Sequence, residues 1–402
     1  MDRRLVPRPL AAHLASAVML WSSSRAVLPV LKAASLPSSA AAELLRGLAA
    51  EIDAFGSNGV TEALNLEITR RAEAYFIGLE AYRRHPYRRC DAGAPVLWRE
   101  GTTRLLDYGR DTAGPVLLIV PSLINRFYVL DLLPELSFLR YLAERGLRPL
   151  VVDWDVPGKE ERDFDLTDYI AGRLESAFDA ALHLARGPIG VAGYCMGGLF
   201  ALALALRRDE TACLALLATP WDFHAERAPP ARFFGLIADH LPLLCGQQGT
   251  LPVEMIQSLF FMLDPFSAER KFTRFAALDP NGDEARAFVA LEDWVNDGVP
   301  LAAAAARDCA QSWYGDNEPA RSQWQIGGET VDPKLLRPPA LVVIPSHDRI
   351  VPPSSAEALA AALRGATVLR PPLGHVGMMA AARAPATLWT AIADWLRARL
   401  EA

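Results

Sequence analysis

One short segment of the sequence combines the residue types that nucleophilic catalysis needs. Gly193-Tyr194-Cys195-Met196-Gly197-Gly198 follows an apolar run and precedes a helical pattern. This is the Gly-x-nucleophile-x-Gly arrangement of a sharp strand-to-helix turn, here with cysteine as the nucleophile. Bulky side chains beside such a turn would clash, which explains Gly193 and Gly197. The N-terminus of the following helix favours a thiolate, so we predict that Cys195 is the nucleophile; the alternative for an isolated motif is a turn with an inert cysteine.

A base and an acid follow later in the chain, in the order that such enzymes use. Asp348 and His375 each come directly after one of the last apolar runs, where strands should end. Loops after late strands carry the acid and the base in this arrangement. We predict that His375 accepts the Cys195 proton and that Asp348 holds the imidazole tautomer. Asp222 is an alternative acid, and His347 is an alternative base.

The reaction also needs donors for a developing oxyanion. One backbone N–H is expected from Met196, the residue after the nucleophile. The second is expected from the loop after the first central strand, where we favour the N–H of Leu123 over that of Ser122.

The elements that position these residues alternate between strands and helices. Buried strands are predicted at Val116–Val120, Pro149–Val152, Ile189–Ala192, Leu214–Ala218, Ala340–Ile344 and, in a shorter run, Ala366–Leu369. Helices are predicted near Asp131–Arg145, Leu166–Arg186, Gly198–Arg208, Ser355–Arg364 and Pro385–Leu400. Such βαβ units form a mostly parallel central sheet flanked by helices. Together with the turn and the order of the three residues, this pattern indicates an α/β-hydrolase fold.

The pattern divides the chain into three regions. Residues 1–95 read as a helical N-terminal region, and residues 96–225 with 337–402 read as the α/β-hydrolase core. Residues 226–336 lose the alternation and are rich in Phe and Trp, so we expect an inserted cap over the C-terminal edge of the sheet.

This cap should control access of water to the nucleophile. We expect Phe260, Phe261 and Trp294 to point inward. We also expect Cys195 to be buried and to be reached through a narrow, mainly apolar tunnel beneath a mobile segment of the cap. The alternative is that these aromatic residues only form the cap's own small core.

Composition excludes several classes of function. A formal net charge of −6 gives no reason to expect a nucleic-acid partner. The five cysteines are scattered and lack Cys-x-x-Cys spacing, which argues against a zinc site and for a reducing, cytoplasmic location. The apolar run Leu10–Trp21 is too short for a membrane span, which needs roughly 20 residues. We interpret it as a helix, with a signal peptide as the alternative.

Several segments resemble the polyhydroxyalkanoate synthase family. The matching segments are Gly193–Gly198 with its cysteine, Pro121–Leu132, Asp153-Trp154, Asp168-Tyr169, Thr219-Pro220 with Asp222-Phe223, Ile326-Gly327-Gly328 with Val331-Asp332, and Asp348–Pro352. They occur in the family's order over roughly residues 95–402, and they most resemble the shorter catalytic subunits of two-subunit synthases. The chain departs from the family's usual pattern at Arg349, which replaces a histidine, and after His375.

The resemblance implies a cap-covered Cys-His-Asp site that transfers 3-hydroxyacyl groups from CoA thioesters to a growing polyester. It implies no cofactor, because the CoA thioester is a substrate. It implies as partners a 3-hydroxyacyl-CoA, the polyester chain, a second copy of the chain or a partner subunit, and the surface of a polymer granule in the cytoplasm.

Two other functions are compatible with the same residues. The first is a hydrolase: a thioesterase, a dienelactone-hydrolase-like enzyme or a polyester-cleaving esterase, in which water replaces the hydroxyl acceptor. Dienelactone hydrolases share Gly-Tyr-Cys-x-Gly-Gly but lack the Ile124–Leu132 segment. The second is a granule-associated scaffold without activity, against which the complete set of Cys195, Asp348 and His375 argues.

Overall fold

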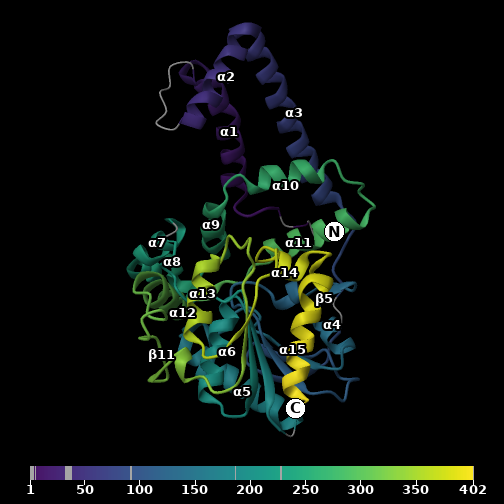
Figure 1. Ribbon diagram of the computed structural model, residues 1–402, viewed down its shortest axis with the longest axis vertical. Coiled ribbons are helices and arrows are strands. Elements are labelled where there is room, and N and C mark those ends of the chain that lie inside the picture. The colour runs from purple at the N-terminus through teal and green to yellow at the C-terminus, as the bar shows by residue number, and fades with distance from the viewer. Residues whose placement is uncertain are drawn as a thin grey trace. The chain divides into compact units, whose positions relative to one another are not determined.

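The computed structural model describes residues 4, 6–31, 39–90, 93–185, 187–226 and 229–401 (Figure 1). The chain forms two compact units. The helical unit consists of Met1–Tyr87 and Asp264–Asn296, and the α/β unit consists of Arg88–Leu263 and Asp297–Ala402.

An eight-stranded sheet runs through the described part of the α/β unit, in the order β1-β2-β6-β3-β7-β8-β13-β14. Its strands are β1 (Val96–Glu100), β2 (Thr103–Asp107), β3 (Val116–Val120), β6 (Arg148–Asp153), β7 (Ile189–Tyr194), β8 (Thr211–Leu217), β13 (Ala340–Val343) and β14 (Thr367–Leu369). The strands from β6 to β14 are parallel, while β1 and β2 add an antiparallel edge. The mostly parallel sheet of the α/β-hydrolase fold is therefore confirmed.

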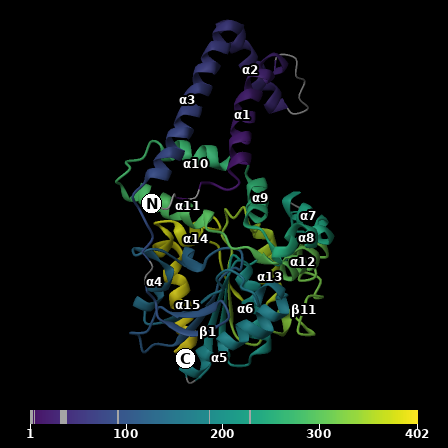
Figure 2. The same cartoon turned by 180° about the vertical axis from the view of Figure 1, so that it is seen from behind.

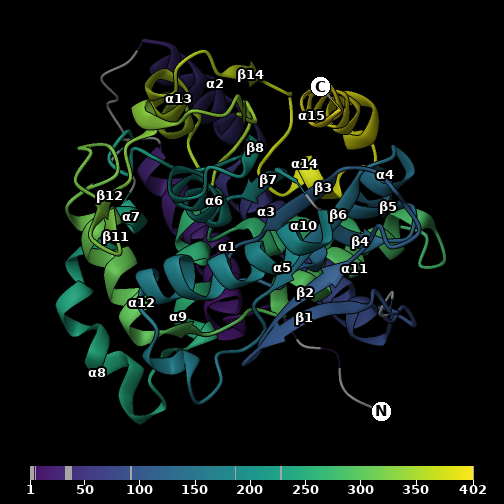
Figure 3. The ribbon, with the colours of Figure 1, turned by 90° about the horizontal axis from the view of Figure 1, so that it is seen from below.

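Helices cover both faces of this sheet. They are α4 (Phe138–Glu144), α5 (Glu175–Ala185), α6 (Met196–Arg207), α13 (Pro353–Ala362), α14 (Gly377–Ala380) and α15 (Thr390–Leu400). Figure 3 shows α5 and α6 on one side of the sheet and α15 on the other. Every residue of β3 is buried, which explains its continuous Val-Leu-Leu-Ile-Val run.

One predicted helix is wrong in its first half. The segment predicted as a helix from Asp131 instead forms a short hairpin of β4 (Asp131–Leu133) and β5 (Leu136–Ser137) before α4. Pro134 disfavours a helical conformation in the residue before it, and Ser137 then caps α4 by accepting a hydrogen bond from the N–H of Arg140, 3.1 Å.

The remaining part of the α/β unit carries short helices and strands. These are α7 (Pro229–Leu236), α8 (Leu241–Cys245), β9 (Thr250–Leu251), α9 (Val253–Leu263), β10 (Leu301–Ala302), α12 (Ala303–Asp308), β11 (Gln325–Ile326) and β12 (Glu329–Thr330). A π-helical segment, Cys309–Gly315, continues α12. Figures 1 and 2 show α7, α8 and α12 gathered on one side of this unit.

The helical unit contains α1 (Leu10–Leu31), α2 (Ser39–Phe55), α3 (Ser57–Arg84), α10 (Ser267–Phe275) and α11 (Asp283–Asn296). Residues 264–296 were expected in the cap, but they group with the N-terminal helices. The reason is aromatic packing: Tyr82 of α3 meets the Phe272 ring edge-on at 5.5 Å. Gly78 lets the two helices approach, because a Cβ there would overlap the backbone of Phe272.

Candidate active site

Cys195 lies between the end of β7 and the start of α6, as the motif predicts. Its backbone has φ 56° and ψ −126°, which is a strained conformation for a residue other than glycine. The turn is held by hydrogen bonds from the Cys195 N–H to the Leu217 carbonyl, 2.8 Å, and from the Gly198 N–H to the Cys195 carbonyl, 2.9 Å. Backbone strain at the residue between strand and helix is typical of a nucleophile turn.

The glycines of the turn are required by close backbone approach. A Cβ on Gly193 would overlap the backbone of Gly197 and Gly198, and a Cβ on Gly197 would overlap the carbonyl of Val120. Gly198 is equally constrained, because a Cβ there would overlap the Thr219 hydroxyl. Sequence reasoning explained the first two glycines and gave no role to the third.

His375 and Asp348 form a buried pair. The His375 Nδ1 lies 2.7 Å from Asp348 Oδ2, and the two residues are 7% and 6% exposed. The other carboxylate oxygen accepts hydrogen bonds from the N–H groups of Ile350, 2.8 Å, and Val351, 2.9 Å. These contacts fix the carboxylate and leave Nε2 of the imidazole for another partner.

Cys195 acts electrostatically on this imidazole. Burial alone would lower the pKa of His375, but Cys195 and the hydrogen bonds to Asp348 and Cys195 raise it to about 10. A raised pKa favours the imidazolium form of His375, which can donate a proton in acyl transfer. The hydrogen bond between His375 and Asp348 joins two of the three predicted residues, and Cys195 stays the predicted nucleophile beside them.

Tyr194 supports the histidine from the nucleophile strand. Its hydroxyl donates to the His375 carbonyl at 3.2 Å, and the two rings lie 5.3 Å apart. Burial, with the nearby Cys195 and Asp348, raises the pKa of Tyr194 well above its usual value, so the hydroxyl stays a donor. Sequence reasoning missed this residue, although its place inside the motif was a signal.

The alternative acid, Asp222, and the alternative base, His347, take no part in the hydrogen bond between His375 and Asp348. Asp222 accepts a hydrogen bond from the Asn317 amide at 2.9 Å, and the Asn317 oxygen accepts one from the Phe223 N–H at 3.0 Å. Asp222 thus joins the loop after β8 to the segment after the π-helix. His347 is exposed, whereas the histidine paired with Asp348 is buried.

The loop after β3, residues 121–125, is called the oxyanion loop, and it adjoins the turn at Cys195. Val120 at the end of β3 pairs with Gly193 of β7, and Leu123 follows as a buried residue. Met196 is the first residue of α6, so its N–H has no partner within the helix. Within the described residues, no hydrogen bond from the Leu123 N–H is found. The N–H groups of Met196 and Leu123 stay the predicted oxyanion donors.

One aromatic residue near the thiol, Tyr314, was not among the residues predicted to point inward. Cys195 is half-buried, whereas we expected a fully buried thiol. Tyr314 is half-buried, and desolvation and then the neighbouring Cys195 raise its pKa. Its ring meets Phe223 at 4.9 Å and Phe234 at 5.3 Å. Trp294 belongs to the helical unit.

The described residues contain neither a metal-binding cluster nor a membrane-spanning helix. No group of three or more His, Cys, Asp or Glu side chains among them is arranged to hold a metal ion. No helix among them is long and apolar enough to cross a membrane.

Comparisons with known proteins show the family of the chain. Residues 115–382 match the family model described as the alpha/beta hydrolase fold. The poly(3-hydroxyalkanoate) polymerase subunit PhaC of Allochromatium vinosum is 30% identical over 72% of this chain and 83% of its own length. That of Synechocystis sp. is 30% identical over 70% and 78%. That of Haloferax mediterranei is 27% identical over 76% and 64%, so the match spans less than two thirds of that relative.

The family model covers most of the chain, and two relatives reach 30% identity over more than two thirds of their length. The chain belongs to the α/β-hydrolase fold family and, within it, to the poly(3-hydroxyalkanoate) polymerase family.

Proposed function

We propose that this protein is an acyltransferase that moves 3-hydroxyacyl groups from CoA thioesters onto a growing polyester. The observation that carries the proposal is the connected set of Cys195, His375 and Asp348 at the nucleophile turn, in a chain of the polymerase family. Cys195 is the nucleophile, His375 the base, and Asp348 the acid that orients the imidazole.

In the first half-reaction, the Cys195 thiolate attacks the thioester carbonyl. The N–H groups of Met196 and Leu123 stabilise the oxyanion that develops on the carbonyl oxygen. The intermediate collapses with cleavage of the bond to CoA, and the CoA sulfur takes the proton of the His375 imidazolium. One thioester replaces another, so the acyl-enzyme remains activated.

In the second half-reaction, a 3-hydroxyl group attacks the acyl-enzyme. His375 accepts the hydroxyl proton as the new C–O bond forms, and the Cys195 thiolate leaves. The product is an oxyester, which is more stable than the thioester, so chain growth is favourable. The site needs no cofactor, because the activation is supplied by the CoA thioester itself.

Exclusion of water decides between polymer and free acid. The half-buried Cys195 and Tyr314 and the buried Phe234 support a site in which access of water is restricted. A hydrolase remains the second candidate, because the match to the α/β-hydrolase family model concerns a fold that also serves hydrolysis.

The setting of the reaction is part of the proposal. We infer a cytoplasmic protein that works at a polymer granule, with a second copy of the chain or a partner subunit. The helical unit supports this inference, because Leu44, Phe55 and Leu66 expose 76%, 80% and 68% of their surface.

The deciding experiment supplies the protein with 3-hydroxybutyryl-CoA, follows release of CoA, and separates polymer from free acid. We expect CoA release with polymer as the main product. Stoichiometric free 3-hydroxybutyrate would make the protein a thioesterase. If no CoA were released, 3-hydroxyacyl-CoA thioesters would not be the substrates of this protein.

A further inference from the structure

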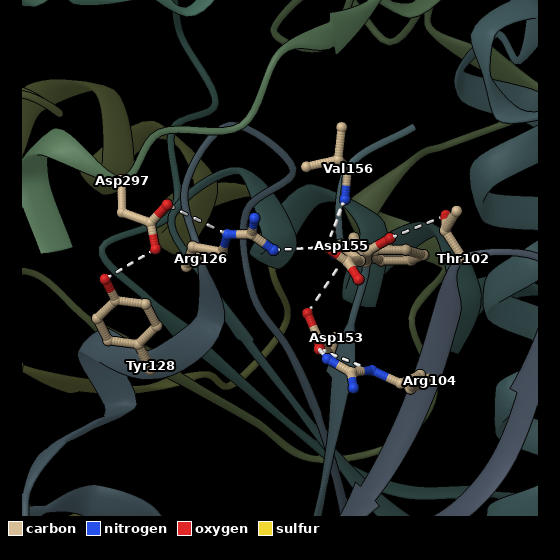
Figure 4. Close-up of polar contacts among 9 residues, drawn as sticks. Thr102, Arg104, Arg126, Tyr128, Asp153, Asp155, Val156 and Asp297 are labelled. Atoms are coloured by element: carbon tan, nitrogen blue, oxygen red, sulfur yellow. Dashed lines mark hydrogen bonds and ion pairs between the residues drawn. The ribbon is translucent and has the colours of Figure 1, made fainter. Parts of the chain in front are cut away.

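A cluster of charged side chains lies directly after the oxyanion loop (Figure 4). Arg126 donates from Nη1 to Asp155 Oδ1 at 2.5 Å, and its Nε forms an ion pair with Asp297 Oδ1 at 3.6 Å. Tyr128 donates its hydroxyl to the other oxygen of Asp297, at 3.0 Å. One guanidinium is thus held between two carboxylates from distant parts of the chain.

The Asp155 side of this cluster is itself rigidly held. Asp155 has φ 55°, a strained value for a residue other than glycine, in the loop after β6. Its N–H donates to Asp153 at 3.2 Å, and its side chain accepts from the Val156 N–H at 2.8 Å. Asp153 is in turn bound by Arg104 Nε at 3.1 Å. A strained turn of this kind persists only where neighbouring contacts hold it.

The Asp297 side is connected to the same loop through the backbone. The Val299 N–H donates to the Ile124 carbonyl at 3.1 Å, and Asn125 pairs with Gly298 in an antiparallel bridge. The segment after Leu123 is therefore anchored on one side by the loop after β6 and on the other by residues 297–299. No residue of the triad takes part in these contacts.

We propose that Arg126 is a positioning residue for the oxyanion hole. By binding Asp155 and Asp297 together, it fixes the loop that presents the Leu123 N–H to the reacting carbonyl. This inference rests on the proposed role of Leu123. An oxyanion donor acts only if it is held near its final place, and a misplacement of about 1 Å costs roughly 100-fold in rate. Arginine suits this task because its planar fork can bind two carboxylates at once.

The test compares Arg126→Ala and Arg126→Lys with a matched control, Arg207→Ala. Arg207 is similarly buried, with 19% against 24% of its side chain exposed, and it also binds two carboxylates, Glu175 and Glu329. It lies at the far end of α6 from Cys195. Each variant is first checked for folding by its thermal unfolding transition.

Two rates distinguish a defect in the oxyanion hole from a defect in the triad. Acyl transfer is measured with 3-hydroxybutyryl-CoA and also with p-nitrophenyl butyrate, whose cleavage needs the same oxyanion but no polymerisation. Alkylation of Cys195 by iodoacetamide needs the thiolate but forms no oxyanion. The ester assay keeps the inference testable even if the protein makes no polymer.

We expect Arg126→Ala to lower kcat roughly 10- to 100-fold in the acyl-transfer assays, with a smaller change in KM and an unchanged alkylation rate. Arg126→Lys should recover part of kcat, and Arg207→Ala should stay near wild type. The inference is overturned if Arg126→Ala resembles Arg207→Ala, or if alkylation falls in parallel with acyl transfer. If Arg126→Ala does not fold, Asp297→Asn, which removes one charge without changing shape, replaces it with the same expected pattern.

Discussion

The two units of the chain bury their apolar side chains in different ways. In the α/β unit, β3, β7 and nearly all of α6 are buried, and a functional residue follows the end of a buried strand. In the helical unit, the aromatic core is buried, but α2 and α3 leave Leu44, Phe55 and Leu66 exposed. The first unit uses its packing to fix chemical groups. Exposed apolar side chains occur in both units, since Leu236 and Leu243 of the α/β unit are 80% and 84% exposed, so the units differ in what their buried packing positions.

The largest effect is expected at the nucleophile. Cys195→Ala should reduce CoA release from 3-hydroxybutyryl-CoA to background, because the thiol forms the acyl-enzyme. The protein should remain folded, since the side chain is half-buried and lies outside the sheet. CoA release at a substantial fraction of the wild-type rate would show that another residue performs the chemistry.

The acid is tested by two matched substitutions. Asp348→Asn should lower kcat roughly 10³- to 10⁴-fold, because an amide no longer stabilises the reactive imidazole tautomer. Asp222→Asn should leave most activity, because Asp222 binds Asn317 and not His375. Steady-state kinetics of both variants check this. If Asp222→Asn lost most of its activity while Asp348→Asn kept it, Asp222 would be the catalytic acid instead of Asp348.

Packing around the turn predicts a large loss of stability from one added methyl group. Gly197→Ala should lower the free energy of unfolding by about 1–3 kcal/mol, because the new Cβ overlaps the backbone of Val120 and Pro121. Gly172→Ala is the control, since nothing lies within 4 Å of its added Cβ. Urea unfolding of the two variants measures the difference. Equal stabilities would contradict the close approach of β3 and α6.

The pKa of His375 makes part of the stability depend on pH. Because its folded pKa is raised from 6.5 to about 10, this contribution is fully present below about 6.5 and is lost as pH rises through about 10. The stability advantage of wild type over His375→Gln should therefore shrink over this range. Unfolding curves at several pH values measure it. An advantage that grows with pH would mean that the imidazole is buried in its neutral form.

The smallest effect on the isolated protein is expected in the helical unit. Leu44→Gln and Phe55→Gln should change stability by no more than about 0.5 kcal/mol, because both side chains are exposed. Their effect should appear in binding to polymer granules, measured by co-sedimentation. If both variants bound granules as well as wild type does, the exposed apolar side chains would not mediate granule association.

Much of the α/β unit could be predicted because its signals are local. The parallel strands are short apolar runs, and Cys195, Asp348 and His375 each follow one of them; β7 and β13 are buried and β14 is partly buried. The antiparallel strands β1 and β2 were missed. β1 is mostly exposed and has no such run.

Features that depend on distant residues could not be predicted. The grouping of residues 264–296 with the N-terminal helices depends on Tyr82 meeting Phe272, and the role of Asp222 depends on Asn317. In each case the partners are separated by many residues, and nothing in either local sequence identifies the other.

The central claim is that an acyl group passes through Cys195. The most direct measurement mixes the protein with 3-hydroxybutyryl-CoA, stops the reaction in acid within the first turnover, and locates the added mass by peptide mass spectrometry. We predict a 3-hydroxybutyryl group, or a short oligomer of it, on the peptide that contains Cys195, and none in Cys195→Ala. Release of CoA with the acyl group on another residue, or with no acyl-enzyme under conditions that trap thioesters, would contradict the account.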